Sequence, residues 1–394
     1  MKIIHTSDWH LGHEMYNYRR QEEFEDFFRQ LRGIVAEEQP DALLVSGDVY
    51  HSTIPTIMTQ TLYTEAMLSL HEACPTMQTI VTAGNHDSAS RLEIDRSLWR
   101  HFHVQVVGGL ARSQDPDWLD HHIIPVADKG WVVAVPHVYA QNFPPSDTGD
   151  RQKAFFTKIM RRACERNTDN LPIVLMAHLA VQDPNEPHAY ALAGNMDFHD
   201  VSSLGKGYDY AALGHLHRPS LVTAASTAVR YCGSPLPTTF NEDYMHSVTV
   251  ARVEHGMPPL LDIIPITPLR QVHTIPEQPT AFEEALNILS QWPDDDPSYL
   301  RLNVLLDEGL PVDATEQALR VTEGKKCRFC TFHVVDNQPQ AGQHHLTDIS
   351  PEEFRELQPL EIAARYLESE GIEDGEWLEM MRHTIEMMNM EDAQ

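Results

Sequence analysis

The sequence predicts an α/β fold with a layered β-sheet core and flanking helices, followed by a small α/β domain and a helical C-terminal tail. Three observations predict it. Short apolar runs alternate with helical patterns in the first half, the pattern changes after a proline-rich stretch at 258–268, and helical apolar stripes end the chain. At 394 residues, the chain is also too long for one ordinary hydrophobic core.

Six short apolar runs are expected to form the strands of the core. They are KIIHT (2–6), ALLVS (42–46), TIVTA (79–83), WVVAV (131–135), IVLMA (173–177) and YAAL (210–213). Between the first two runs, apolar residues recur at the spacing of one helix face, which predicts a helix packed on the sheet. These residues are Phe24, Phe27, Phe28, Leu31 and Val35.

The second half of the chain predicts two further parts. The prolines of 258–268 indicate a connector. Beyond it, the pattern predicts a helix, a strand, a helix and a strand, at 280–291, 299–306, 313–322 and 327–335. We therefore expect a main domain at 1–268, a small α/β domain at 269–345 and a helical tail at 346–394.

The tail is strongly acidic and amphipathic. Residues 346–394 hold 14 acidic and 3 basic residues, so this segment is not expected to touch DNA. Its apolar stripes are Leu360, Ala363, Ala364 and Leu367, then Trp377, Met380, Met381, Ile385 and Met388. Met-rich helix faces suit docking on a partner protein, and packing against the chain's own domain is the alternative.

The overall composition is that of a protein of a reducing compartment. Five scattered cysteines do not form a disulfide framework, and the N-terminus enters a strand-like run without a signal-peptide pattern. No apolar stretch is long enough to span a bilayer, so we expect a cytoplasmic protein without membrane contact. A net charge of −29 repels bare nucleic acid, so a phosphate-bearing substrate would need bound cations or a partner.

Polar residues with metal-binding side chains follow five of the predicted strands. They are Asp8, His10, Asp48, Asn85, His178, His215 and His217. Ligands bind at the carboxyl ends of strands in α/β sheets, so these side chains are expected to converge. Oxygen and imidazole donors suit Mn²⁺, Fe²⁺ or Zn²⁺. Seven donors exceed the need of one ion, which favours two ions with Asp48 as the bridging carboxylate.

These motifs resemble a known family. DWHLG, GD, GNHD, the histidine after IVLMA, and GHLH occur in the order that is typical of the metallophosphoesterase (calcineurin-like) family. The opening HTSDWHLG and the stretch YCGSPLPTTFNE at 231–242 are similar, more narrowly, to its bacterial nuclease subunits that act with an SMC-like ATPase. The resemblance is strongest over 1–245 and continues only as a similar layout beyond them.

The resemblance implies a role for each candidate residue. One Mn²⁺ would be held by Asp8, His10, Asp48 and His217, and the other by Asp48, Asn85, His178 and His215. Water activated by both ions would attack a phosphodiester. His86 would face the substrate as proton donor or charge stabiliser, and Asp87 would orient its imidazole.

The resemblance also implies an activity and partners. It implies a DNA exonuclease and endonuclease for double-stranded or hairpin ends, used in DNA repair, recombination and replication. The small domain would recognise DNA, the SMC-like ATPase would dock on the C-terminal helices, and two nuclease subunits would pair within a heterotetramer. The alternatives are a generic phosphatase or cyclic-nucleotide phosphodiesterase, and a non-enzymatic scaffold.

Some residues depart from this pattern or fit no part of it. His51 stands where the family often has an acid, so contacts around the ligands or the substrate are expected to differ. His13 fits no ligand position and is expected to be a loop or substrate-side residue. Cys327 and Cys330 have no second cysteine pair, so a zinc site there is not expected.

Overall fold

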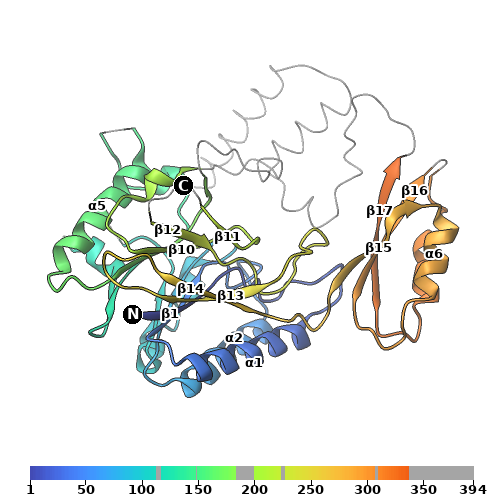
Figure 1. Ribbon diagram of the computed structural model, residues 1–394, viewed down its shortest axis with the longest axis horizontal. Coiled ribbons are helices and arrows are strands. Elements are labelled where there is room, and N and C mark those ends of the chain that lie inside the picture. Colours follow the sequence, from blue (N-terminus) through green and yellow to red (C-terminus); the bar gives the residue numbers. More distant parts are fainter. Residues whose placement is uncertain (112–116, 148, 183–198, 223–226, 307–308, 337–394) are drawn as a thin grey trace. The chain divides into compact units, whose positions relative to one another are not determined.

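The computed structural model describes the chain except residues 112–116, 148, 183–198, 223–226, 307–308 and 337–394 (Figure 1). The described residues form two compact units, and the chain passes from the first to the second between Gln271 and Val272. The predicted mixed α/β class is confirmed. The tail helices expected over 346–394 lie outside the described residues.

The first unit contains two six-stranded sheets. The first sheet has the order β14-β13-β1-β2-β3-β4, in which β1 to β4 are parallel and β13 and β14 are antiparallel. Its strands are β1 (Lys2–Thr6), β2 (Ala42–Ser46), β3 (Gln78–Thr82), β4 (Val104–Val107), β13 (Ser247–Arg252) and β14 (Leu260–Pro265).

The second sheet has the order β11-β12-β10-β7-β6-β5, and its four inner strands are parallel. Its strands are β5 (Ile123–Val126), β6 (Gly130–Val135), β7 (Ile173–His178), β10 (Tyr210–Gly214), β11 (Ser220–Leu221) and β12 (Ala228–Tyr231). A small separate pair consists of β8 (Val181–Gln182) and β9 (His199–Asp200).

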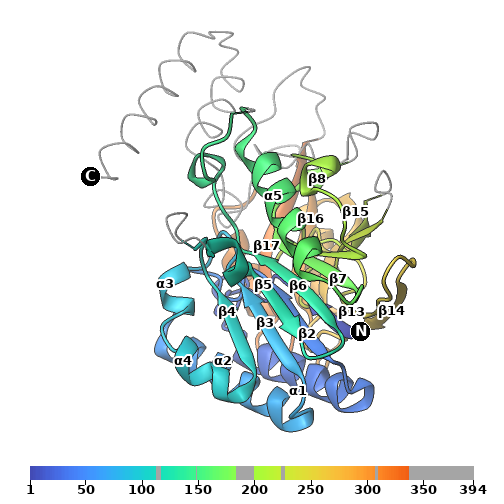
Figure 2. The ribbon, with the colours of Figure 1, turned by 90° about the vertical axis from the view of Figure 1, so that its left-hand side faces the viewer.

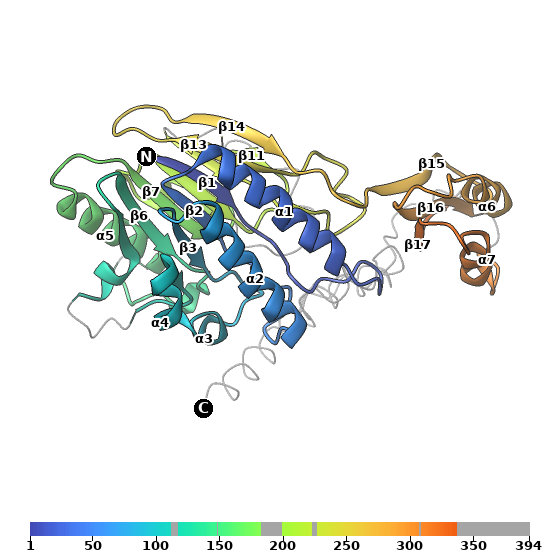
Figure 3. The ribbon, with the colours of Figure 1, turned by 90° about the horizontal axis from the view of Figure 1, so that it is seen from below.

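The two sheets face each other, and helices cover their outer faces (Figure 2). Helices α1 (Gln21–Glu38) and α2 (Ile57–Ala73) lie side by side over the first sheet (Figure 3). Helix α5 (Arg151–Arg166) covers the second. The short helices are α3 (Ala89–Leu92), α4 (Arg96–Trp99), η1 (Arg100–Phe102), η2 (Trp118–His122), η3 (Ala140–Asn142) and η5 (Val201–Leu204).

Apolar side chains fill the space between the layers. Between the sheets, Ile3, Leu44 and Ile80 share one buried cluster with Val132, Val174 and Ala212. The apolar residues predicted from Phe24 to Val35 form the buried face of α1. The predicted helix and the face by which it packs on the sheet are therefore confirmed. Burial on both faces explains why the inner strands read as continuous apolar runs.

The structure corrects one sequence expectation and refines another. The stretch 258–268 is more than a connector, because β14 pairs there with β13 at the edge of the first sheet. Pro265 at its end is compatible with an edge position, where a missing N–H costs no ladder bond. The six predicted strands are also shared equally between the two sheets, so the candidate ligands come from both. No described helix is long and apolar enough to cross a membrane.

The second unit is a small α/β structure. Its described residues form the parallel sheet β15-β16-β17, from β15 (Val272–Thr280), β16 (Tyr299–Leu306) and β17 (Arg328–Asp336). Helices α6 (Phe282–Ser290) and α7 (Ala314–Val321) share one buried cluster with the sheet. Both helices lie within the ranges that the sequence predicts.

Candidate metal centre

All seven candidate ligands lie at carboxyl ends of strands of the first unit, or just beyond them. Strands β1, β2 and β3 of the first sheet lead to Asp8 and His10, to Asp48 and to Asn85. Strand β7 of the second sheet ends on His178, and β10 leads to His215 and His217. The structure brings these side chains together at one end of the two facing sheets.

One group of donors surrounds the side chain of His10. Its Nε2 atom lies 3.0 Å from Nε2 of His217 and 3.6 Å from Oδ2 of Asp48. The ligand atoms of Asp8, His10 and His217 all lie within 4.8 Å of one another. Two donors bound at about 2.1 Å to one octahedral ion stand about 3.0 Å apart, so this spacing fits a shared cation.

A second group surrounds His178. Its Nε2 atom lies 2.9 Å from Oδ1 of Asn85 and 3.4 Å from Oδ2 of Asp48. Nδ1 of His215 lies 3.0 Å from the same amide oxygen of Asn85. Oδ2 of Asp48 therefore borders both groups, which is the position a bridging carboxylate requires.

The hydrogen bonds of the His178 imidazole indicate whether a cation fits between His178 and Asn85. Nδ1 of His178 lies 2.9 Å from the carbonyl oxygen of Ser46, so Nδ1 carries the proton that it donates. In the neutral ring, Nε2 then holds a lone pair that faces the oxygen of Asn85. A lone pair facing an oxygen is repulsive unless a cation or a proton lies between them.

The charges of His178 and Asp48 also favour a bound cation. Burial opposes a charged His178, but the Asp48 and Asp8 carboxylates outweigh it and raise its pKa to about 9. Burial also opposes the carboxylate of Asp48, yet the neighbouring His178 and His10 hold the pKa of Asp48 well below its usual value. The centre thus attracts positive charge at the place where His178 and Asp48 meet.

The backbone is strained at four of the seven candidate ligands. Asp8, His10, Asp48 and His215 have positive φ angles of 52°, 45°, 50° and 99°. Non-glycine residues adopt such angles rarely, and where they do the cost is of order 1–3 kcal/mol each. Strain of this kind clusters at functional sites, because only a surrounding structure that demands it can maintain it.

Two glycines of the motifs are required by close packing against ligands. A Cβ atom on Gly84 would stand 1.9 Å from Oδ1 of Asp48. One on Gly47, whose φ is +86°, would stand 2.2 Å from Nδ1 of His178. The Gly-Asp and Gly-Asn-His-Asp motifs thus bring three strand ends close enough for their side chains to meet.

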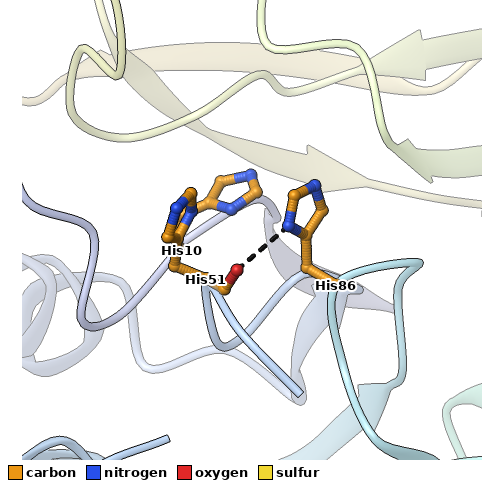
Figure 4. Close-up of side chains that lie close together, drawn as sticks. All are labelled: His10, His51 and His86. Carbon is orange, nitrogen blue, oxygen red and sulfur yellow. Dashed lines mark hydrogen bonds between the residues drawn. The ribbon is translucent and has the colours of Figure 1, made fainter. Parts of the chain in front are cut away.

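His86 lies beside the first group of donors. Figure 4 shows its Nδ1 atom donating to the carbonyl oxygen of His51, over 3.0 Å. The rings of His51 and His86 are stacked at 5.6 Å, and the ring of His10 meets that of His86 edge-on at 4.9 Å. The three imidazoles form a cluster with ligand atoms within 4.8 Å of one another.

The expectation that Asp87 orients the imidazole of His86 is wrong. The Asp87 carboxylate accepts hydrogen bonds from the backbone N–H groups of Val49, Tyr50 and Gly84, at 2.9–3.0 Å. The carbonyl oxygen of His51 holds the His86 ring instead. Burial and the Asp48 charge raise the pKa of Asp87 to about 6, and the backbone donors oppose that rise. Asp87 therefore ties the turn after β2 to the turn after β3.

Sequence reasoning missed two residues at the centre. Glu242 accepts a hydrogen bond from Nδ1 of His217 at 2.9 Å, and it lies within the stretch 231–242 that carries the family resemblance. His137 follows strand β6, and its ring lies edge-on to that of His178 at 6.0 Å. The rule that found the other histidines, a polar residue after a predicted strand, would also have found His137.

His13 lies in a loop, as the sequence suggests, but its side chain does not face solvent. It is buried, and its Nδ1 atom accepts a hydrogen bond from Arg20 at 3.0 Å. Arg20 is itself buried and paired with Glu23 at 2.9 Å. The ring of His13 meets that of His51 edge-on at 4.8 Å, so His13 supports the cluster from behind.

Comparison with known proteins agrees with this geometry. The calcineurin-like phosphoesterase family matches residues 1–219, the part of the chain that carries every candidate ligand. The chain is similar to proteins named as the SbcD component of the nuclease SbcCD. It is 32% identical to that of Rhodobacter capsulatus over 278 residues, which cover 66% of this chain and 68% of the relative.

Two further relatives carry the same name. The chain is 29% identical to the Escherichia coli K12 protein over 332 residues, 79% of each chain. It is 30% identical to the Bacillus subtilis protein over 275 residues, 65% of this chain and 67% of the relative. The chain belongs to the calcineurin-like phosphoesterase family and, within it, to the SbcD group.

Proposed function

We propose that this chain is the nuclease subunit of an SbcCD-type complex and hydrolyses DNA phosphodiesters with two divalent ions, by preference Mn²⁺. The observation that carries the proposal is the convergence of seven oxygen and imidazole donors around the shared carboxylate of Asp48. Mixed oxygen and imidazole donors suit Mn²⁺, and the absence of thiolates from the set disfavours softer metals.

The residues divide between holding the ions and handling the substrate. Asp8, His10, Asp48 and His217 would hold one ion, and Asp48, Asn85, His178 and His215 the other. Two such ions supply Lewis-acid activation of water and of the phosphodiester. The buried carboxylates of Asp8 and Asp48 keep that charge in place, because burial leaves it poorly screened.

His86 is the proposed catalytic histidine. Its Nδ1–H bond to the His51 carbonyl oxygen fixes the ring and leaves Nε2 for the substrate. There the protonated ring would give its proton from Nε2 to the leaving oxygen, or stabilise the negative charge of the transition state. Asp87 contributes by fixing the turn that carries His86.

The charge of the chain supports a partner for DNA binding. At −29, the chain repels bare DNA, so an SbcC-like SMC-family ATPase would supply the basic surface. We propose that residues 346–394 dock this ATPase, that residues 269–345 recognise DNA as a cap, and that two nuclease subunits pair in a heterotetramer. The five free cysteines support work in the reducing cytoplasm.

A nuclease assay on the purified chain tests this function. Linear and hairpin-ended DNA would be incubated with Mn²⁺, Mg²⁺ or Zn²⁺, with and without the ATPase, and we expect cleavage with Mn²⁺ that the ATPase stimulates. Efficient hydrolysis of small phosphomonoesters or cyclic nucleotides with DNA left intact would instead establish the phosphatase or cyclic-nucleotide phosphodiesterase alternative.

Removal of the tail tests the docking proposal separately. A chain ending at residue 345 should lose binding to the ATPase in a pull-down while it still binds two Mn²⁺ ions. Full retention of ATPase binding would show that the tail serves its own domain.

A further inference from the structure

Glu242 is a buried carboxylate directly behind a proposed metal ligand. It is 7% exposed, and its Oε1 atom lies 2.9 Å from Nδ1 of His217. Its Oε2 atom accepts hydrogen bonds from the Ser234 hydroxyl and the Thr238 backbone N–H, each at 3.1 Å. These bonds fix the carboxylate, so His217 must keep its proton on Nδ1 and present Nε2 to the centre.

In the part of the chain that the structure describes, no carboxylate accepts a hydrogen bond from the far nitrogen of His178. Nδ1 of His178 donates to the backbone carbonyl oxygen of Ser46 at 2.9 Å, and a carbonyl group is neutral. The two groups share Asp48, and Nε2 of His10 and His178 lie at similar distances from it, 3.6 and 3.4 Å. Apart from the Asp8 carboxylate, which is assigned to the first ion alone, the difference between the groups is the negative charge that Glu242 places one imidazole ring away from the first.

A carboxylate that accepts the far N–H of a ligating histidine makes the imidazole a stronger donor. Loss of such a carboxylate typically weakens metal binding by about 10–100-fold. The effect is expected to be large here because Glu242 is buried and water screens it poorly. A neutral carbonyl group orients its histidine equally well but adds no net charge.

From this contrast we propose that Glu242 makes the two metal positions unequal. The position bordered by Asp8, His10, Asp48 and His217 binds its ion first and more tightly. The position bordered by Asp48, Asn85, His178 and His215 fills second. Glu242 acts through His217 and is a positioning residue. The inference rests on the proposed two-ion function and deepens it by assigning an order of loading.

The test is a Mn²⁺ titration of the metal-free full chain, followed by electron paramagnetic resonance of the unbound ion. The wild-type chain should show one tight and one weaker site. Glu242→Gln, which removes only the charge, should weaken the tight site by about 10–100-fold and leave the weaker one within about threefold. Glu254→Gln, the same change at an exposed position after β13, should alter neither site.

A second variant assigns the two sites. Asn85→Ala removes a donor of the second position alone, so it should abolish the weaker site and retain the tight one. Glu242→Gln added to Asn85→Ala should then weaken the remaining site by the same factor as in the wild-type background. If Glu242→Gln does not fold, Glu242→Asp is used in its place. Its shorter side chain keeps the negative charge but places it farther from His217, so Mn²⁺ affinity at the tight site should fall several-fold.

The outcomes separate this inference from the proposed function. Two equal sites in the wild-type chain, an unchanged tight site in Glu242→Gln, or an equal loss at both sites would overturn the inference and leave the two-ion centre standing. A wild-type chain that binds fewer than two Mn²⁺ ions would contradict the proposed function itself.

Discussion

The Nε2 atoms of His10 and His217 lie 3.0 Å apart, although 207 positions separate the two residues along the chain. His10 follows strand β1 of the first sheet and His217 follows β10 of the second, so the pairing depends on the two sheets facing each other. Two nitrogen donors at this distance fit one bound cation. The candidate metal centre therefore depends on the folding of both sheets of the first unit.

Replacing His86 should separate chemistry from metal binding. In His86→Ala, DNA cleavage with Mn²⁺ should fall about 100- to 10,000-fold, the range that a general acid contributes, while two Mn²⁺ ions remain bound. His101→Ala, at an exposed histidine of η1, should retain full activity. The measurements are single-turnover cleavage rates and metal content. Loss of metal from His86→Ala would place His86 among the ligands.

Adding one methyl group at Gly84 should disrupt the centre. In Gly84→Ala, the new Cβ would overlap Oδ1 of Asp48 at 1.9 Å and its backbone nitrogen at 2.3 Å, so Asp48 must move. We expect Mn²⁺ affinity to fall at least tenfold, measured by titration calorimetry. Gly33→Ala is the matched control, because nothing beyond the backbone of α1 itself lies within 4 Å of the new Cβ atom. This substitution should stabilise α1 by about 0.5–1 kcal/mol. Unchanged Mn²⁺ affinity in Gly84→Ala would contradict the packing described at Asp48.

The seven candidate ligands could be picked out from the sequence because each follows a recognisable apolar run or belongs to a short motif. Their partners were not, because they come from elsewhere in the chain. Glu242 reaches His217 from a segment without a strand, and Ser46 acts through its backbone carbonyl oxygen, which no residue type signals. Asp87 was assigned the wrong partner because neighbours in sequence need not interact, and its carboxylate turns to backbone N–H groups.

For the fold too, features that depend on neighbouring residues could be predicted, whereas features that depend on distant parts of the chain could not. Period and apolarity predicted the presence and the buried face of α1, and they predicted the six inner strands to within a residue at each end. They could not reveal that the strands divide into two sheets, which depends on long-range pairing. Strand β14 was missed because its pattern is mostly exposed and prolines border it, features that an edge strand shares with a loop.

The buried ion pair at the start of α1 should be essential for stability. Arg20 and Glu23 are each 1% exposed at the side chain, and Arg20 also donates to His13 and to the carbonyl oxygen of Pro237. Arg20→Ala removes the cation that compensates the buried Glu23 charge, so the free energy of unfolding, measured by urea denaturation, should fall by about 3–5 kcal/mol.

The exposed pair of Arg29 and Asp26 on the same helix is the control for Arg20. Arg29 is 74% exposed at the side chain, so Arg29→Ala should change the free energy of unfolding by about 1 kcal/mol or less. Equal losses in the two variants would show that the Arg20 pair contributes no more than a surface pair.

Stability should fall in mild acid because of His5. Burial and the nearby Arg230 charge lower the pKa of His5 to about 3, whereas an unfolded histidine titrates near 6.5. As the pH falls below 6.5, His5 binds a proton in the unfolded chain but not in the folded one. The free energy of unfolding should therefore fall by about 2 kcal/mol between pH 7.5 and 5.0. In His5→Gln, the free energy of unfolding should fall by about 2 kcal/mol less than in the wild-type chain over the same pH interval. Identical pH dependence in urea titrations would contradict the lowered pKa.

Anomalous diffraction at the manganese edge, from crystals of the full chain grown with Mn²⁺, tests the central claim most directly. We expect two peaks per chain. One would be contacted by Asp8, His10, Asp48 and His217, and the other by Asp48, Asn85, His178 and His215. A single peak, or a peak held by the His10, His51 and His86 imidazoles in place of either, would contradict the two-ion centre bridged by Asp48.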